Sequence, residues 1–251
     1  SLGWGVQSWT LAAMAALKAE GITVDKAAYV AGHSLGEYAA LCAAGTFSLS
    51  DTARLLRIRG RAMQAAVPVG QGAMAALLGL SFEQAEAVAA EAAQGEVCQV
   101  ANQNDPAQNV VSGSKAAVER AIDLAKAAGA KRALLLPVSA PFHCALMAPA
   151  AEEMAGALAD VTMNAPAVPV VANVVAEAVT DPDQIRKLLI EQVTGQVRWM
   201  SSVEWMGAQG VTEVWEIGAG KALSGMIRRI NKEITCVNIG TAADVAAVKT
   251  A

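Results

Sequence analysis

A serine between two glycines is the residue best suited to nucleophilic chemistry. Gly32, Ser34 and Gly36 fit the pattern Gly-x-Ser-x-Gly, after an apolar run at 27–31 that predicts a buried strand and before a predicted helix at 37–44. A serine on such a strand-to-helix turn lies at the helix N-terminus, where free N–H groups favour a developing oxyanion. The alternative is a glycine-rich turn with an incidental serine, but the flanking strand and helix favour a nucleophile.

A serine nucleophile needs a base, and the chain contains two histidines, His33 and His143. His33 is adjacent to Ser34, so its side chain leaves the turn in another direction. His143 is therefore our candidate base, in a proline-containing loop of the kind that often carries site residues; the alternative is a solvated loop histidine. Asp105 or Glu119 could orient the imidazole, and a backbone carbonyl could do so equally well.

An arginine on an apolar helix face is the third candidate. In the helix predicted at 51–66, Arg59 falls within the arc of the apolar residues. The other arginines of this helix cluster on another side: Arg54, Arg57 and Arg61. A buried arginine must be paired, either with an internal carboxylate or with an anionic ligand held bidentately. With a nucleophilic serine nearby, Arg59 predicts an acyl substrate that carries a carboxylate.

The elements that position these residues fall into two groups. Between residues 69 and 138, the order strand, helix, strand, strand, helix, strand predicts a ferredoxin-like subdomain. Its elements are expected at 73–78, 81–93, 97–101, 109–112, 114–128 and 132–136, with a polar turn at 103–106. Residues 1–68 and 139–251 alternate strands with helices, which predicts an α/β core whose mostly parallel sheet is covered on both faces.

The core elements have their own boundary signals. The first helix is expected at 8–20, with Ser8 as its N-cap and Gly21 past its end. Further strands are expected at 168–172, 211–217 and 234–239. Further helices are expected at 145–159, 182–193, 197–208 and 221–230.

Composition bounds the class of protein. The 251 residues have a net charge of −4, which argues against a nucleic-acid binder. A hydrophobic fraction of 54% excludes disorder, and no apolar run approaches the about 20 residues that a membrane span needs. Four scattered cysteines and two histidines argue against a structural zinc site and suit the reducing cytoplasm. Because the chain begins with Ser1 and not with Met, we expect that its natural start is missing, and the sequence does not decide whether a targeting peptide preceded it.

Motifs along nearly the whole chain resemble the malonyl-CoA:acyl-carrier-protein transacylase family. They are AGHSLGEY at 31–38, IRG at 58–60, MQ at 63–64, GAM at 72–74, PFHCALM at 141–147, NAPxVPVV at 164–171, QVxW at 196–199, VE at 203–204 and EIGxGK at 216–221. The resemblance implies an α/β-hydrolase-like core with an inserted ferredoxin-like subdomain. This order of elements agrees with the one read from the pattern.

The resemblance also implies roles. Ser34 would form the malonyl ester, and His143 would act as general base and acid. Arg59 would bind the malonyl carboxylate. The main-chain carbonyl of Gln192 would orient the histidine, and the Leu35 amide would be one oxyanion donor.

Two further residues would contact the substrate: His33, and Phe142, which resembles the malonyl-selective form of its loop. The implied reaction moves malonyl from CoA to the phosphopantetheine thiol of acyl carrier protein, in fatty acid biosynthesis, with no metal or redox cofactor. We expect a cytoplasmic monomer without membrane or nucleic-acid partners. An acidic carrier would need a basic docking surface, for which the candidates are Lys131, Arg132, Arg228 and Arg229.

One departure from the family concerns the first residues. The family begins with a strand and a glutamine-containing loop that supplies a second oxyanion amide, and nothing before Ser8 resembles that segment. The family's Gln-Pro-Ala reads Gln7-Ser8-Trp9 here. The loss of an oxyanion donor can lower the rate on the order of 10²–10³-fold, so we expect this chain alone to be weakly active or inactive. The alternatives are a serine thioesterase or esterase, and an inactive truncated remnant.

Overall fold

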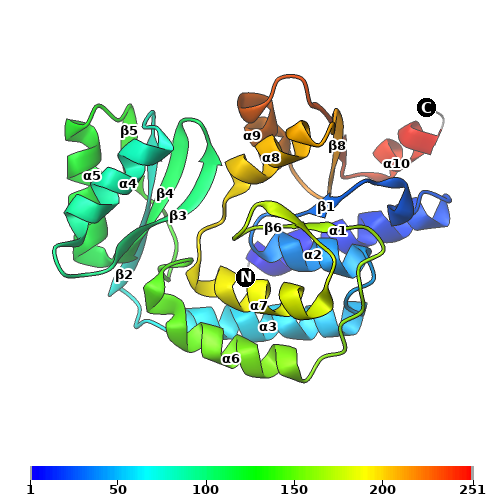
Figure 1. The fold of residues 1–251 in the computed structure, drawn as a ribbon, viewed down its shortest axis with the longest axis horizontal. Helices are drawn as coiled ribbons and strands as arrows, with labels where there is room; N and C mark the ends of the chain where they lie inside the picture. The colour runs from blue at the N-terminus through cyan, green and yellow to red at the C-terminus, as the bar shows by residue number, and fades with distance from the viewer. Residues whose placement is uncertain (1, 250–251) are drawn as a thin grey trace.

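The computed structural model describes residues 2–249, which contain three separate sheets (Figure 1). The largest is four-stranded and antiparallel, in the order β3-β4-β2-β5. Its strands are β2 (Gly72–Leu78), β3 (Cys98–Asp105), β4 (Gln108–Ser114) and β5 (Arg132–Leu135). Helices α4 (Phe82–Ala93) and α5 (Lys115–Ala127) pack together on this sheet and bury a small-residue core of mainly alanine, valine and leucine. These elements match the order expected between residues 69 and 138.

The β3–β4 hairpin is longer than the sequence pattern indicates. The expected turn at 103–106 lies mostly within β3, and Asn102, Gln103 and Asn104 are buried. Their strand is paired on its second edge as well, because Val197 donates to the Ala101 carbonyl and accepts from the Gln103 N–H. Tertiary pairing therefore keeps polar residues in a strand where local composition favours a turn.

The other strands form two small sheets instead of one. In the first, β1 (Val30–Ala31) pairs in parallel with β6 (Val170–Ala172), which pairs antiparallel with β7 (Glu177–Val179). In the second, β8 (Glu213–Ile217) pairs in parallel with β9 (Thr235–Ile239). A largely apolar cavity of about 890 Å³ is lined by residues of both β1 and β8, and it separates the two sheets. Two of the three pairings are parallel, but the single continuous sheet that the alternation predicts is not formed by residues 2–249.

Helices surround these two sheets (Figure 1). Their bounds are α1 (Leu2–Ala19), α2 (Leu35–Ala43), α3 (Leu49–Ala65), α6 (Ala148–Ala159), α7 (Pro182–Thr194), α8 (Trp199–Ala208), α9 (Ala222–Ile230) and α10 (Ala242–Lys249), with 3-10 turns at Val24–Lys26 and Ala145–Met147. Helix α1 begins at Leu2, so the expectation that Ser8 caps it is wrong. Within residues 2–249, no helix combines the length and apolarity that crossing a membrane requires.

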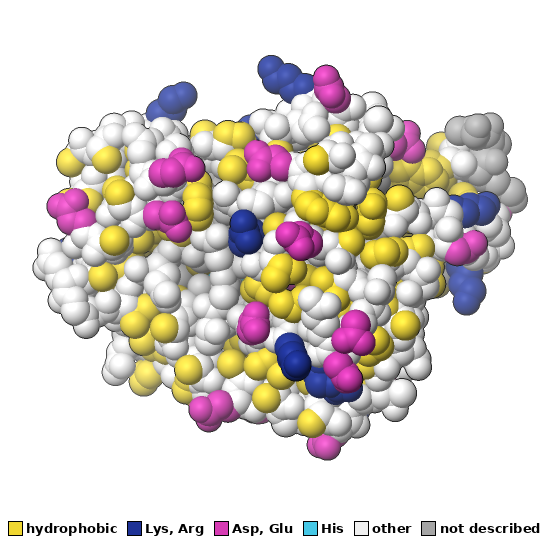
Figure 2. Space-filling view, viewed as in Figure 1, with side chains coloured by type: hydrophobic (Ala, Val, Ile, Leu, Met, Phe, Trp, Pro, Cys, Tyr) yellow, Lys and Arg dark blue, Asp and Glu magenta, His cyan; other side chains and the backbone are white. Residues whose placement is uncertain are grey.

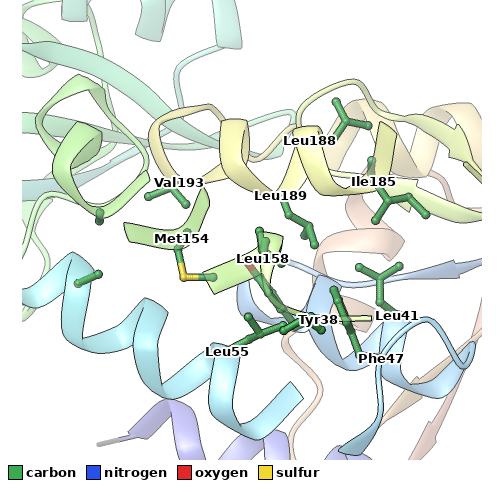
Figure 3. Close-up of a cluster of buried hydrophobic side chains, with 14 of the residues drawn as sticks. Tyr38, Leu41, Phe47, Leu55, Met154, Leu158, Ile185, Leu188, Leu189 and Val193 are labelled. Carbon is green, nitrogen blue, oxygen red and sulfur yellow. The ribbon is translucent and has the colours of Figure 1, made fainter. Parts of the chain in front are cut away.

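The main hydrophobic core fixes α2 against α3, α6 and α7 (Figure 3). The side chains labelled there are Tyr38, Leu41, Phe47, Leu55, Met154, Leu158, Ile185, Leu188, Leu189 and Val193. Helix α3 begins after a Ser48 cap, and α7 begins after an Asp181 cap with Pro182 in its first turn. This packing places α2, α3 and α7 around the turn that precedes α2.

Candidate active site

Ser34 lies on the turn between β1 and α2 in a strained backbone conformation, with φ 54° and ψ −111°. The turn depends on its first glycine, because a Cβ at Gly32 would lie 2.1 Å from the carbonyl carbon of Gly36. A Cβ at Gly36 itself would meet no atom within 4 Å. Of the two glycines in the pattern, therefore, only Gly32 is demanded by close backbone approach.

The serine hydroxyl contacts the candidate base directly. The Ser34 Oγ lies 2.7 Å from the Nε2 of His143, whose Nδ1 lies 2.8 Å from the main-chain carbonyl oxygen of Gln192. A carbonyl oxygen only accepts, so Nδ1 carries the proton and Nε2 is free to accept from the hydroxyl. This assignment gives the neutral tautomer that a general base requires.

The two acidic residues considered as orienters lie elsewhere. Asp105 forms an ion pair with Arg229 at 2.7 Å, and Glu119 lies 3.9 Å from Lys115. The Gln192 carbonyl holds the imidazole instead. The Arg229 Nε is bonded to the buried Asp105, while 54% of the arginine side chain stays exposed.

Burial keeps His143 neutral. Its side chain is 5% exposed, and desolvation together with the positive charge of Arg59 lowers its pKa to about 3. The hydrogen bond to the Gln192 carbonyl acts in the opposite direction but does not overcome burial. At neutral pH the imidazole is therefore ready to take a proton from Ser34.

Arg59 is buried beside the nucleophile without a carboxylate partner. It is 5% exposed, and its Nη2 donates to the Ser34 Oγ at 3.0 Å and to the Gln192 Oε1 at 3.0 Å. Its Nε is buried with no acceptor, and no carboxylate in residues 2–249 forms an ion pair with it. An unpaired guanidinium in this position is suited to an anionic ligand. Of the two partners considered from sequence, an internal carboxylate is not in ion-pair contact: the buried Glu37 carboxyl group interacts with the charge of Arg59 but is hydrogen-bonded to Gln192 and Asn173.

Two residues that the sequence analysis missed complete the site. Asn173 follows β6 and accepts from the Ser34 N–H at 2.7 Å, and Glu37 accepts from the Gln192 side chain at 2.8 Å. Burial is the largest influence on the pKa of Glu37 and raises it to about 7. A signal for Asn173 existed: the carboxyl ends of neighbouring parallel strands meet at one edge of a sheet, and β6 is the parallel neighbour of β1.

The remaining candidates lie around this centre. The His33 Nε2 is 2.9 Å from the Asn104 Oδ1, and its ring is 5.8 Å from that of Trp199. Phe142, next to His143, packs partly buried against two hydrophobic clusters. The Leu35 N–H lies at the start of α2, and it has no acceptor among residues 10–248, the part of the chain whose side chains the structure describes. The described part of the chain also has no grouping of histidine, cysteine or acidic residues that could hold a metal ion.

The known proteins that this chain resembles are acyltransferases. The family model for the acyl transferase domain matches residues 5–203. The malonyl CoA-acyl carrier protein transacylase of Escherichia coli K12 is 52% identical over 208 residues, which are 83% of this chain and 67% of that protein. The protein of that name from Bacillus subtilis is 43% identical over 231 residues, or 92% of this chain and 72% of that protein.

Solved structures agree in fold. The acyl-carrier-protein-S-malonyltransferase of Bartonella henselae superposes with a TM-score of 0.94 at 53% identity and covers 96% of this chain and 77% of its own. A malonyl-transacylase solved in complex with its type II PKS acyl-carrier protein gives a TM-score of 0.94 at 40% identity, with coverages of 97% and 78%.

Proposed function

Because this chain belongs to the acyl transferase domain family, we propose that it moves a malonyl group from CoA to the phosphopantetheine thiol of an acyl carrier protein. One observation carries the malonyl part of the proposal: the unpaired Arg59 guanidinium contacts the hydroxyl that would be acylated. The named relatives and the solved transacylase–carrier complex support the same substrates.

The first half-reaction acylates Ser34. His143 Nε2 takes the hydroxyl proton as Ser34 Oγ attacks the thioester carbonyl carbon of malonyl-CoA. The oxyanion accepts a hydrogen bond from the Leu35 N–H at the N-terminus of α2. When the tetrahedral intermediate collapses, the carbon–sulfur bond breaks, and the imidazolium returns its proton to the departing CoA sulfur. Malonate is then held as an ester on Ser34.

The second half-reaction runs the same steps in reverse with a new thiol. The phosphopantetheine thiol of the carrier gives its proton to His143 and attacks the ester carbonyl. The ester bond breaks, and the proton passes to the Ser34 oxygen. The Gln192 carbonyl keeps the imidazole in the required tautomer throughout. Malonyl-CoA is the only small molecule that this scheme consumes, and it uses no metal or redox cofactor.

Arg59 would select the acyl group by binding its free carboxylate in a bidentate, charge-assisted manner. Phe142 and His33 complete our substrate-binding set, with His33 held by Asn104 at the neighbouring cavity. We also propose a division of the chain into two parts. Residues 1–68 and 139–251 form an α/β-hydrolase-like core, and residues 69–138 form a ferredoxin-like subdomain, in line with the sheet order β3-β4-β2-β5.

The setting of the proposal is cytoplasmic fatty acid synthesis by a monomer. An acidic carrier would dock on Lys131 and Arg132, which are exposed at the start of the edge strand β5, and on Arg228. Basic and acidic side chains are scattered over the face in Figure 2, so a docking surface there would consist of a few residues. Reversal of the charges at 131 and 132 should weaken transfer to the carrier while acylation by malonyl-CoA stays unchanged; equal transfer would remove this surface from the proposal.

A thioesterase with the same serine and histidine is the competing function, and product analysis separates the two. Incubation with malonyl-CoA and a holo carrier protein should give malonyl-carrier in excess of free malonate. A preparation that gives free malonate, with the carrier left unmodified, would contradict the transferase and support the hydrolase.

A further inference from the structure

The strained turn at Ser34 is held by two side chains from outside it. The Asn173 Oδ1 accepts from the Ser34 N–H at 2.7 Å, and the Gln192 Nε2 donates to the Ser34 carbonyl at 3.0 Å. Asn173 also donates to the Gly32 carbonyl at 2.7 Å. The peptide groups on both sides of the nucleophile are therefore fixed by an asparagine after β6 and a glutamine of α7.

Both of these residues donate to one oxygen of Glu37, Gln192 through its side chain and Asn173 through its backbone. The Glu37 Oε2 accepts from the Gln192 Nε2 at 2.8 Å and from the Asn173 backbone N–H at 3.2 Å. Glu37 is 1% exposed, so water is poorly placed to substitute for this oxygen. The carboxylate contacts neither the serine hydroxyl nor the imidazole, and the mechanism above does not use it.

Gln192 connects this oxygen to the reacting groups. Its main-chain carbonyl accepts from His143, and its Oε1 accepts from Arg59. A change in the rotamer of Gln192 would therefore break its hydrogen bonds to the Ser34 carbonyl and to Arg59, in the residue whose main-chain carbonyl orients His143. A carboxylate buried within such a network is better explained by positioning than by packing alone.

We propose that Glu37 is a positioning residue, whose Oε2 holds Asn173 and Gln192 so that these residues keep Ser34 and His143 in reacting geometry. The inference rests on the proposed function only in taking Ser34 and His143 as the reacting groups. What matters in it is an acceptor oxygen at the right place, not the charge of the carboxylate.

Two conservative variants separate the effect of the position of the acceptor oxygen from the effect of the negative charge at residue 37. Glu37→Gln retains an oxygen at the same reach and loses the charge, whereas Glu37→Asp retains the charge and withdraws the oxygen by one methylene. Single-turnover acylation of Ser34 by malonyl-CoA should stay within about threefold of wild type in Glu37→Gln and fall roughly tenfold in Glu37→Asp. Glu37→Ala should fall about 10²-fold, because two buried donors lose their acceptor.

A second readout does not need the substrate. The chain has two histidines, so ¹⁵N-histidine NMR resolves the His143 imidazole, whose Nδ1–H signal should move in Glu37→Ala and Glu37→Asp and stay in place in Glu37→Gln. A control for stability is Leu77→Ala, which opens a cavity in the core of the four-stranded sheet and should acylate at the wild-type rate.

Three outcomes would contradict the positioning role of Glu37. The inference is overturned if Glu37→Asp is as fast as Glu37→Gln, if Glu37→Gln shows the moved imidazole signal, or if Leu77→Ala slows as much as Glu37→Ala. Should Glu37→Ala fail to fold, the Asp and Gln pair decides the question by itself. If wild type is not acylated by malonyl-CoA, the proposed function fails, and the imidazole signals still test the positioning.

Discussion

The Nη2 of Arg59 lies 3.0 Å from the Oγ of Ser34. The proposed anchor for a carboxylate and the proposed nucleophile for a carbonyl are thus in direct contact in the free protein. An acyl group that uses both must have its carboxylate and its reacting carbonyl close together, as they are in malonate, where one methylene separates them. Longer dicarboxylic acyl groups would have to fold back on themselves.

Replacement of Arg59 tests the anchor. We expect Arg59→Ala to lower acylation by malonyl-CoA roughly 10- to 100-fold, because a charge-assisted hydrogen bond contributes about 1.5–3 kcal/mol. Acylation by acetyl-CoA, which has no carboxylate, should change much less. The comparison is a rate measurement with both donors, with Arg57→Ala, an exposed position of the same helix, as the matched control. Equal reductions in the acylation rate with both donors would show that Arg59 does not bind the malonyl carboxylate.

The pH dependence of acylation tests the state of His143. A general base works when it is deprotonated, and a pKa near 3 keeps this imidazole deprotonated well below the usual histidine range. We therefore expect kcat/KM for malonyl-CoA to show no acid limb between pH 5 and 7. An inflection near 6.5 that is set by His143 would mean that the imidazole is solvated and that the burial described above is absent in solution.

The stability of the protein should respond to Glu37. The pKa of Glu37 in the folded state is about 7, above the ordinary value of 4.5. Between these two pH values the folded state binds a proton that the unfolded state has lost, so the free energy of unfolding of wild type falls as the pH rises from 4.5 through 7. Arg59 and Tyr38 are the charged or titratable groups coupled to it, and Asn173 and Gln192 are its neutral partners. Relative to Glu37→Gln, wild type should lose on the order of 2–3 kcal/mol between pH 5 and 8.

Urea unfolding at several pH values measures this difference, because the variant removes only the one titration. Two unfolding free energies that run parallel between pH 5 and 8 would show that the Glu37 pKa is ordinary. His143 contributes the opposite dependence, since its lowered pKa makes stability fall as the pH falls below about 6.5, but this contribution is the same in both proteins and cancels.

The two glycines around Ser34 should tolerate substitution very differently. Gly32→Ala places a Cβ inside the Gly36 backbone, so the turn must open, with a cost of about 3 kcal/mol or more and loss of acylation. Gly36→Ala meets open space and should retain stability, and a small gain is expected because alanine favours a helix. Thermal unfolding of the two variants side by side measures the contrast. Comparable stabilities would mean that the close approach at Gly32 is not required.

Much of the fold follows from local patterns in the sequence. Helix α3 ends within a residue of its expected limit, and α4 follows a Ser81 capping box at the expected position. The expectations that were wrong concern elements whose structure depends on contacts between distant segments of the chain. Gln103 and Asn104 are expected in a turn because they are polar, yet they lie in β3, where Val197 accepts from the Gln103 N–H and donates to the Ala101 carbonyl. The one continuous core sheet was inferred from alternation alone, which carries no information on which strands pair.

Some residues of the candidate site could also be predicted from local sequence context, and others could not. Ser34, His143 and Arg59 could be selected from residue type and context, and the structure brings them together. Glu37 and Asn173 could not be selected in that manner, because their importance lies in contacts between segments far apart in the chain. Buried polar partners of this kind carry no local periodicity, so only the folded structure reveals them.

The most direct measurement of the central claim is intact-mass spectrometry after rapid mixing with malonyl-CoA. The account predicts one malonyl adduct per chain, located on Ser34 by peptide mapping, absent in Ser34→Ala and discharged when a holo carrier protein is added. An adduct on another residue, or one that persists in Ser34→Ala, would contradict it.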